Sequence, residues 1–520
     1  MTKKLLLLPA LLFMQQIAQA QITNVLVDNS ASDGECTIII NGSDPSQVLA
    51  ATNPDVIYRS SDGGLTWTEA NVSPFSTVSL IGDVALATDN AGRYYFQSLD
   101  ASYLFRQLRS SDNGVTWNTE TAFGDAGWVE DKNWLTCDRV PGSPYNGRIY
   151  CAWTRRSNGP SDPGYIFLNH SADAGQTWVP RDTLDIVQVS PAVPPIGTGL
   201  AVGPAGEISV TWGGGSPNRI YHKRSTDGGS TWPASPVIVD VNVQPANDYY
   251  DYIQHPISFS AQFTSLACDA SGGPNNGNLY CVWDDVRNGP NNADIFLARS
   301  TDGGQTWATQ RINDDTTTRN QVVPTVAVDP GSGWVFVSYL DARLNTDSFD
   351  DTLHYYLAWS TDGGQTFHNI QVSQQASTIQ NIHSDYMGMD ALGGKVCLLW
   401  VGGVQWQKTW SSCIPQTVLL PLAVAQQEAQ PALVLYPAVP NPATDFTAFD
   451  FQVSEETAVT LTISDLQGKT LIKPVNGTRY LPGRHQVKLF HSEVDLPAGI
   501  YIATVTTLYG QQSRKFIVSK

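Results

Sequence analysis

Three arginines stand at matching points of the chain, each close behind an apolar stretch that contains an aromatic residue. They are Arg155 in AWTRR, Arg287 in VWDDVR and Arg343 in YLDAR. A guanidinium can bind a carboxylate through two parallel hydrogen bonds, so three of them from equivalent positions could hold one anionic group. They could also pair with neighbouring aspartates such as Asp285 and join parts of the fold. The sequence leaves both roles open.

Carboxyl and phenol side chains lie in the segments between these stretches. Glu130 is in GWVEDKNW, Tyr252 in NDYYDYIQHP and Tyr386 in HSDYMG. Such groups can exchange protons or act as nucleophiles when a partner is within hydrogen-bond reach. Because they are far apart in the sequence, the fold has to bring them together.

The strongest signal of that fold is an eight-residue pattern that occurs six times, Ser-x-Asp-x-Gly-x-Thr followed by an aromatic residue. The copies are SSDGGLTW from Ser60, SSDNGVTW from Ser110, SADAGQTW from Ser171, STDGGSTW from Ser225, STDGGQTW from Ser300 and STDGGQTF from Ser360. Successive copies start 50, 61, 54, 75 and 60 residues apart. Repeats at such a period indicate a solenoid or a propeller.

Each copy has the residues of a tight turn between two strands. The carboxylate accepts backbone N–H bonds, and the glycine two residues later permits a positive φ. The closing aromatic ring is expected to be buried against a neighbouring sheet. These aspartates are therefore predicted to be structural: Asp62, Asp112, Asp173, Asp227, Asp302 and Asp362.

Two further apolar stretches precede each copy, which predicts four strands per repeat with the pattern at the turn between the third and fourth strands. After the sixth copy, residues 385–415 supply three more strands, and Ile22–Asn29 precedes the first complete repeat. Joined together, these segments would complete one more unit. The prediction is an all-β chain with a seven-bladed β-propeller, or a six-bladed one if the last segment only caps the ring.

The six patterns resemble the Asp boxes of the sialidase-type, or BNR, β-propeller superfamily, over residues 21–415. The resemblance implies the fold, and it implies that any site lies in the loops at the end of the ring away from the boxes. It does not imply an activity, because such boxes also occur in propellers that cleave other glycans and in receptors.

A sialidase site would need three arginines for the substrate carboxylate, a tyrosine nucleophile with a glutamate base, and an aspartic acid. The resemblance would place Arg155, Arg287 and Arg343 in the first role, Tyr252 or Tyr386 with Glu130 in the second, and Asp285 in the third. The chain departs from sialidases in one respect, because residues 21–59 lack their Phe/Tyr-Arg-Ile-Pro motif.

Two functions therefore remain open from the sequence. The first is a glycoside hydrolase of sialidase-like type that acts on an extracellular glycan or glycoprotein. The alternative is a non-catalytic propeller that binds glycan or protein.

The first 20 residues have the features of a signal peptide, with Lys3 and Lys4 before an apolar run and Ala18-Gln19-Ala20 as a cleavage site. The apolar run is too short to cross a bilayer, and no later stretch is long enough, so no transmembrane segment is expected.

Cysteine usage fits an oxidising compartment. Disulfides are expected between Cys137 and Cys151 and between Cys268 and Cys281, which occupy the same two positions of two repeats. A third disulfide is expected between two of the three remaining cysteines, with the other one left as a free thiol; these are Cys36, Cys397 and Cys413. The spacing does not favour a zinc site.

The C-terminal part of the chain differs in composition. Residues 416–432 have the Gln, Ala and Pro content of a linker, and residues 433–520 alternate as in a small β-sandwich. The motifs YPAVPNPATD, DLQG and GIY resemble the C-terminal sorting domain of type IX secretion cargo in Bacteroidetes-type bacteria. This resemblance implies the type IX machinery as a partner and a secreted or cell-surface location.

The overall charge excludes one class of partner. The chain has 30 basic and 48 acidic residues, a net charge of −18, spread along its length. Such a surface repels phosphate backbones, so nucleic acid is not an expected partner. No phosphate-loop, serine-hydrolase or haem pattern is found, and no cofactor or metal is expected.

Overall fold

The apolar residues of this chain alternate over short segments between glycine-rich turns, and these segments form strands. The chain divides into two compact units, Met1–Leu422 and Ala423–Lys520. The computed structural model describes residues 22–30, 33–156, 163–187, 197–214, 218–241, 243, 263–289, 292–345, 352–378, 384, 386–403, 407–420, 433–466, 468–492, 494, 496–508 and 510–519.

The described part of the first unit contains seven antiparallel sheets, six of four strands and one with a short fifth strand, which we call blades 1 to 7. Blade 1 consists of β2 (Asp33–Ile40), β3 (Val48–Asn53), β4 (Val56–Ser60) and β5 (Thr68–Asn71), and a short 3-10 helix (Ser73–Phe75) follows it. Blade 2 consists of β6 (Leu80–Thr88), β7 (Tyr94–Asp100), β8 (Phe105–Ser110) and β9 (Asn118–Phe123). Blade 3 consists of β10 (Val129–Cys137), β11 (Ile149–Arg156), β12 (Gly164–Ser171) and β13 (Asp182–Val187).

The next three blades repeat this order. Blade 4 consists of β14 (Thr198–Val202), β15 (Ile208–Gly214), β16 (Arg219–Ser225) and β17 (Val237–Asp240). Blade 5 consists of β18 (Ser265–Cys268), β19 (Leu279–Asp285), β20 (Asp294–Ser300) and β21 (Ala308–Arg311). Blade 6 consists of β22 (Gln321–Val328), β23 (Val335–Asp341), β24 (Thr352–Ser360) and β25 (His368–Gln371), with the short β26 (Ser377–Thr378) paired to β24.

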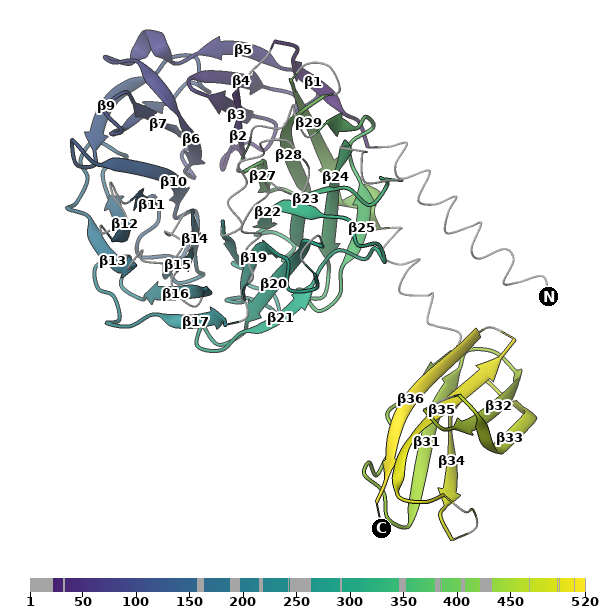
Figure 1. Ribbon diagram of the computed structural model, residues 1–520. Helices are drawn as coiled ribbons and strands as arrows, with labels where there is room; N and C mark the ends of the chain where they lie inside the picture. The colour runs from purple at the N-terminus through teal and green to yellow at the C-terminus, as the bar shows by residue number, and fades with distance from the viewer. Residues whose placement is uncertain are drawn as a thin grey trace. The chain divides into compact units, whose positions relative to one another are not determined.

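The first strands of consecutive blades contact each other in the order β2, β6, β10, β14, β18, β22 and β27, and β27 contacts β2. Figure 1 shows the sheets arranged around a common axis, with these strands innermost. The first unit is therefore a β-propeller, and the prediction of an all-β propeller is confirmed.

Blade 7 takes its outermost strand from the start of the chain. It consists of β27 (Gly388–Ala391), β28 (Lys395–Gly402), β29 (Lys408–Pro415) and β1 (Val25–Asp28). β1 pairs antiparallel with β29, and Val25 lies opposite Ser411. The Ser411 hydroxyl also accepts a hydrogen bond of 2.9 Å from the indole N–H of Trp67 in blade 1. These contacts close the ring.

The Asp boxes form one repeated network of hydrogen bonds. In blade 5, Asp302 Oδ1 accepts the backbone N–H of Thr306 at 2.9 Å, and the Thr306 hydroxyl donates to Asp302 Oδ2 at 2.5 Å. The Ser300 hydroxyl donates to Asp302 Oδ1 and accepts the N–H of Gly304, both at 2.8 Å. The bonds from Thr306 lower the pKa of Asp302 to about 2. The other five boxes make the same four bonds, so these aspartates hold the turns between third and fourth strands.

One disulfide is present in the described residues, between Cys397 and Cys413. These cysteines lie directly opposite each other on β28 and β29. The third thiol of that predicted set, Cys36, is buried and free.

The two other predicted disulfides are not formed, and their four cysteines are free thiols. Cys137 lies opposite Ile149 on the neighbouring strand, whereas Cys151 lies opposite Leu135. The two cysteines are therefore diagonal neighbours, and residues in that relation are about 7–8 Å apart, with their Cβ atoms somewhat closer. A disulfide requires Cβ atoms about 3.5–4.5 Å apart. The same offset separates the second pair, Cys268 and Cys281, so the prediction of these two bonds was wrong.

The second unit contains two antiparallel sheets that share one core. The first sheet is made of β30 (Leu433–Leu435), β31 (Phe446–Val453) and β34 (Gly483–Phe490). The second is made of β33 (Thr470–Tyr480), β32 (Thr457–Ser464), β35 (Gly499–Thr507) and β36 (Gly510–Val518). Phe449 of the first sheet packs edge-on against Phe516 of the second, with ring centroids 5.1 Å apart. Within the described residues, no helix has the length and apolar content to span a membrane.

Candidate functional site

The connections between strands divide between the two ends of the ring. Because the strands of a blade are antiparallel, the turn between the third and fourth strands lies at the same end as the turn between the first and second. We call this end, which carries the Asp boxes, the box end. The connections between second and third strands and between blades lie at the opposite end, which we call the loop end.

Arg155 and Glu130 form a buried ion pair at the loop end of blade 3. Glu130 is 0% exposed and Arg155 4%. The Arg155 guanidinium bonds to the Glu130 carboxylate and to Asp125, in the connection from blade 2, at 2.8 Å. Glu130 also accepts the indole N–H of Trp153 at 2.8 Å. All the strong contacts of Arg155 are therefore with the protein itself.

The other two arginines of the predicted set are paired in the same way. Arg287 bonds to Asp285 of its own blade at 2.5 Å and to Asp240 of the preceding blade at 3.2 Å. Arg343 bonds to Asp341 of its own blade at 2.7 Å. It also bonds at 2.6 Å to Asp314, which follows the last strand of the preceding blade. The structure thus contains the salt bridges between blades that the sequence left as an alternative.

The predicted site residues therefore fall into separate groups. Arg155, Arg287 and Arg343 lie in three ion-pair clusters, in blades 3, 5 and 6. Glu130 and Asp285 are buried partners of these arginines. Two tyrosines were predicted as nucleophile candidates, Tyr252 and Tyr386. Tyr252 lies outside the described residues, so only Tyr386 can be placed.

Tyr386, just before the first strand of blade 7, meets charged residues of blades 1 and 3. Its hydroxyl donates to Glu35 Oε2 and lies at the same distance, 3.2 Å, from the carbonyl oxygen of Val84. The Lys132 ammonium lies 3.1 Å from the centroid of the Tyr386 ring. The Lys132 backbone N–H donates to the carboxylate of Asp83, in blade 2, at 2.9 Å. Four titratable side chains from four blades thus gather at the loop end of the channel, and we call them the mouth cluster: Glu35, Asp83, Lys132 and Tyr386.

Irregular backbone near the start of the first strands positions this cluster. In blade 2 the register shifts between Gly82 and Ala85, and Asp83 has a φ of +57°. The register of blade 3 shifts around Lys132, whose φ is +42°, and that of blade 1 shifts around Glu35. A bulge turns a side chain out of the regular alternation of a strand. Left-handed backbone at non-glycine residues is costly and tends to occur at functional sites.

The environment of the cluster changes its acid–base properties. Burial and the neighbouring Glu35 carboxylate raise the pKa of Asp83 to about 6. Burial raises the pKa of Tyr386 well above its ordinary value, and Glu35 raises it further. Asp83 and Glu35 remain partly exposed, whereas Lys132 and Tyr386 are each 4% exposed. A carboxyl group with a pKa near 6 can donate or accept a proton close to neutral pH.

Glu35 and Asp83 did not enter the sequence-based prediction. The signal that could have identified them is a glycine followed by an acidic residue, Gly34-Glu35 and Gly82-Asp83, at matching points of the first two blades. In the described residues, no group of three or more His, Cys, Asp or Glu side chains is placed to bind a metal ion.

Comparison with known proteins characterises the second unit. The family model described as "Secretion system C-terminal sorting domain" matches residues 437–519. This unit is a sorting domain. The match confirms the resemblance to type IX secretion cargo, and it indicates that the chain is secreted in a Bacteroidetes-type bacterium. No curated protein matches the chain.

Several solved structures are similar to the chain at low identity. One is a protein of unknown function from Dyadobacter fermentans, 15% identical with a TM-score of 0.41, covering 75% of this chain and 97% of that one. Another is an α-L-arabinofuranosidase from Fusarium graminearum, 15% identical with a TM-score of 0.42, covering 64% and 94%. A third is the Hadza microbial sialidase Hz136, 14% identical with a TM-score of 0.41, covering 71% and 73%. At these identities none of them assigns a function to this chain.

Proposed function

We propose that this chain is a secreted propeller that cleaves glycosidic bonds of an extracellular glycan at the loop end of its channel. The observation that carries the proposal is the mouth cluster, in which titratable side chains of four blades meet. In this proposal Asp83 is the general acid, Tyr386 the nucleophile and Glu35 the base that accepts the tyrosine proton. The sorting domain directs export, and the propeller then acts outside the cell.

The chemistry of glycoside cleavage supports this assignment of roles. The leaving sugar oxygen needs a proton, and an acid is most effective when its pKa lies near the working pH. The pKa of Asp83, about 6, meets that need. The Tyr386 hydroxyl already donates a hydrogen bond to Glu35 over 3.2 Å, which is the contact that a tyrosine nucleophile requires of its base.

The proposal leaves Arg155, Arg287 and Arg343 in structural roles, since each is held by carboxylates of its own blade and of the connection or strand before it. It therefore does not require a sugar with a carboxylate group. Neutral glycans belong in the substrate panel together with sialosides.

The test is turnover of aryl glycosides and of plant, algal and glycoprotein glycans by the purified chain. Asp83→Asn is expected to lower kcat on natural glycans by about 100-fold or more, because the general acid is lost. The loss should be much smaller for aryl glycosides whose phenol leaves without protonation. Asp314→Asn is the matched control, since this loop-end carboxylate is 52% exposed and lies outside the cluster. Equal losses on both kinds of substrate would remove Asp83 from the acid role.

A second candidate is a propeller that binds glycan or protein without cleaving it. The observation in its favour is that the Tyr386 side chain is almost fully buried. Under this alternative, saturable binding to a glycan would be measured, and chromatography would detect no product from any substrate.

A further inference from the structure

A cavity of about 530 Å³ occupies the channel at its box end. It is lined by first-strand residues of all seven blades and by residues just beyond those strands, including Gly42, Asn90, Pro141, Ala270, Gly331 and Gly393. Because these residues lie in the connections to the second strands, the cavity is at the end of the ring opposite the mouth cluster. Its volume is within the range of small-molecule sites, about 300–1,000 Å³.

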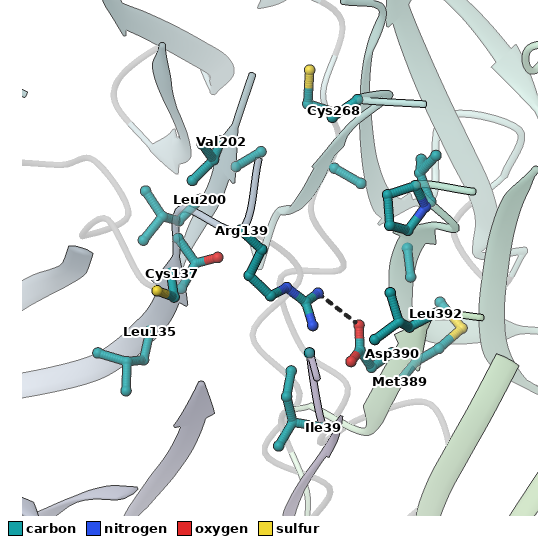
Figure 2. Close-up of a pocket in the computed structure, with 18 of the residues that line it drawn as sticks. Ile39, Leu135, Cys137, Arg139, Leu200, Val202, Cys268, Met389, Asp390 and Leu392 are labelled. Carbon is teal, nitrogen blue, oxygen red and sulfur yellow. Dashed lines mark hydrogen bonds and ion pairs between the residues drawn. The ribbon is translucent and has the colours of Figure 1, made fainter. Parts of the chain in front are cut away.

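The walls of this cavity are mainly apolar. Consecutive residues of the first strands line the channel, and the apolar side chains among them include Ile39, Leu135, Leu200, Val202 and Met389 (Figure 2). Ile39 and Val202 remain partly exposed. Water confined against such walls is poorly hydrogen-bonded, so an apolar body that displaces it lowers the free energy.

One cation reaches into this apolar space from the wall of blade 3. Figure 2 shows the Arg139 side chain extending from there toward Asp390. Its guanidinium makes two long contacts with the described residues, 3.5 Å to Asp390 Oδ1 and 3.4 Å to the carbonyl oxygen of Ile40. Asp390 is better satisfied by backbone, since it accepts the N–H of Ile40 at 2.9 Å and that of Ala391 at 3.0 Å.

Arg139 differs in this respect from the arginines at the loop end. Arg155, Arg287 and Arg343 each hold at least one carboxylate at 2.8 Å or less. The Arg139 side chain is 25% exposed, and its pairing is loose. A guanidinium prefers two short, parallel bonds to a carboxylate, and the described contacts of Arg139 do not supply them.

We propose that this box-end cavity binds a small amphipathic carboxylate, with the carboxylate on Arg139 and the apolar body against the first strands. The apolar walls favour the body of such a ligand, and Arg139, the one basic residue among the described residues that line the cavity, favours an anionic head over a neutral or cationic one. No residue of the mouth cluster lines this cavity, and the proposal does not depend on any catalytic step.

The test compares three probes with the same chain length, decanoate, decanol and decylammonium. Each is titrated into the full chain, and binding is followed by calorimetry and by displacement of anilinonaphthalenesulfonate fluorescence. Decanoate is expected to bind about tenfold or more tightly than decanol, because a hydrogen-bonded charge pair adds to the apolar contact. Decylammonium should bind most weakly.

Two variants locate the site. Arg139→Gln should remove the preference for decanoate over decanol, and Ile39→Trp should weaken both by filling the cavity. Arg93→Gln is the matched control, because Arg93 follows the first strand of blade 2, pairs with Asp89 at 2.6 Å and does not line the cavity. Binding to each variant is measured well below that variant's own unfolding midpoint, because Arg93→Gln removes the cation beside the buried Asp89 carboxylate.

The proposal is overturned if decanoate binds no better than decanol, if no probe binds saturably, or if Arg93→Gln has the same effect as Arg139→Gln. Asp83→Asn is expected to leave decanoate binding unchanged. The cavity and the proposed hydrolase activity can therefore fail separately.

Discussion

Replacing Arg155 by methionine should destabilise the propeller strongly, because it leaves the Glu130 carboxylate buried without its cation. Glu130 is 0% exposed. Methionine keeps much of the apolar stem of the arginine, so the change removes mainly charge. Removing one partner of a buried ion pair costs about 3–5 kcal/mol.

This cost can be converted into a shift of the unfolding midpoint. With an unfolding entropy of about 2.1 cal/mol/K per residue, a ring of roughly 400 residues shifts by about 1.2 °C per kcal/mol. Arg155→Met should therefore lower the midpoint of the propeller transition by about 4–6 °C. Calorimetry of the full chain measures this, with the transition of the sorting domain followed separately.

Two further variants decide whether the buried charge is the cause. The double variant Arg155→Met with Glu130→Gln should recover about 2 kcal/mol, since the amide has no charge to desolvate. Arg224→Met is the control, because Arg224 and Glu207 are 31% and 15% exposed and such a pair contributes about 1 kcal/mol or less. The reasoning is refuted if Arg155→Met costs no more than the control, or if the double variant recovers nothing.

Three other outcomes are expected. Asp302→Ala should cost about 1 kcal/mol in urea denaturation, a value reduced for solvent screening. The pKa of Asp302 is lowered from 3.8 to about 2, so its contribution to the free energy of unfolding is complete above pH 3.8 and is lost as the pH falls toward 2. Between these pH values the stability of Asp302→Ala should therefore fall less than that of the parent chain. Because the general acid must be protonated, glycan cleavage should fall as the pH rises through about 6, and Asp83→Asn should lack this limb of the pH profile. Alkylation of the denatured, unreduced chain should label every cysteine except Cys397 and Cys413, and mass spectrometry that finds Cys137 or Cys268 protected would contradict the free thiols.

The fold could be predicted because its signal is local and repeated. Each Asp box is complete within eight residues, and the hydrogen bonds of Asp302 all join residues within that window. Six such turns define the hairpins, and the apolar stretches before them define the remaining strands. The pairing of β1 with β29 could also be predicted. The segment before the first complete repeat and the three strands after the sixth Asp box each fall short of a four-stranded blade, and together they make one.

The site could be predicted only in part, because it depends on register. The sequence placed Cys137 and Cys151 on one hairpin but could not show that they are two positions out of register. It singled out Tyr386 together with Glu130, whereas the carboxylate within hydrogen-bond distance of the Tyr386 hydroxyl is that of Glu35. Bulges decide the positions of Glu35 and Asp83, and a bulge leaves little trace in composition or periodicity.

The pairing of the first strand with the last one also sets an order of events during folding. The pairing of residues 25–28 with residues 408–415 has the longest sequence separation of the strand pairings in the described propeller. The sheet can therefore be completed only after residues 408–415 are present. Until then β1 has no partner and blade 7 lacks its outermost strand, so the exposed edge of β29 can pair with other chains. A polypeptide that lacks its final blade would therefore be an open ring with an unpaired strand, prone to aggregation.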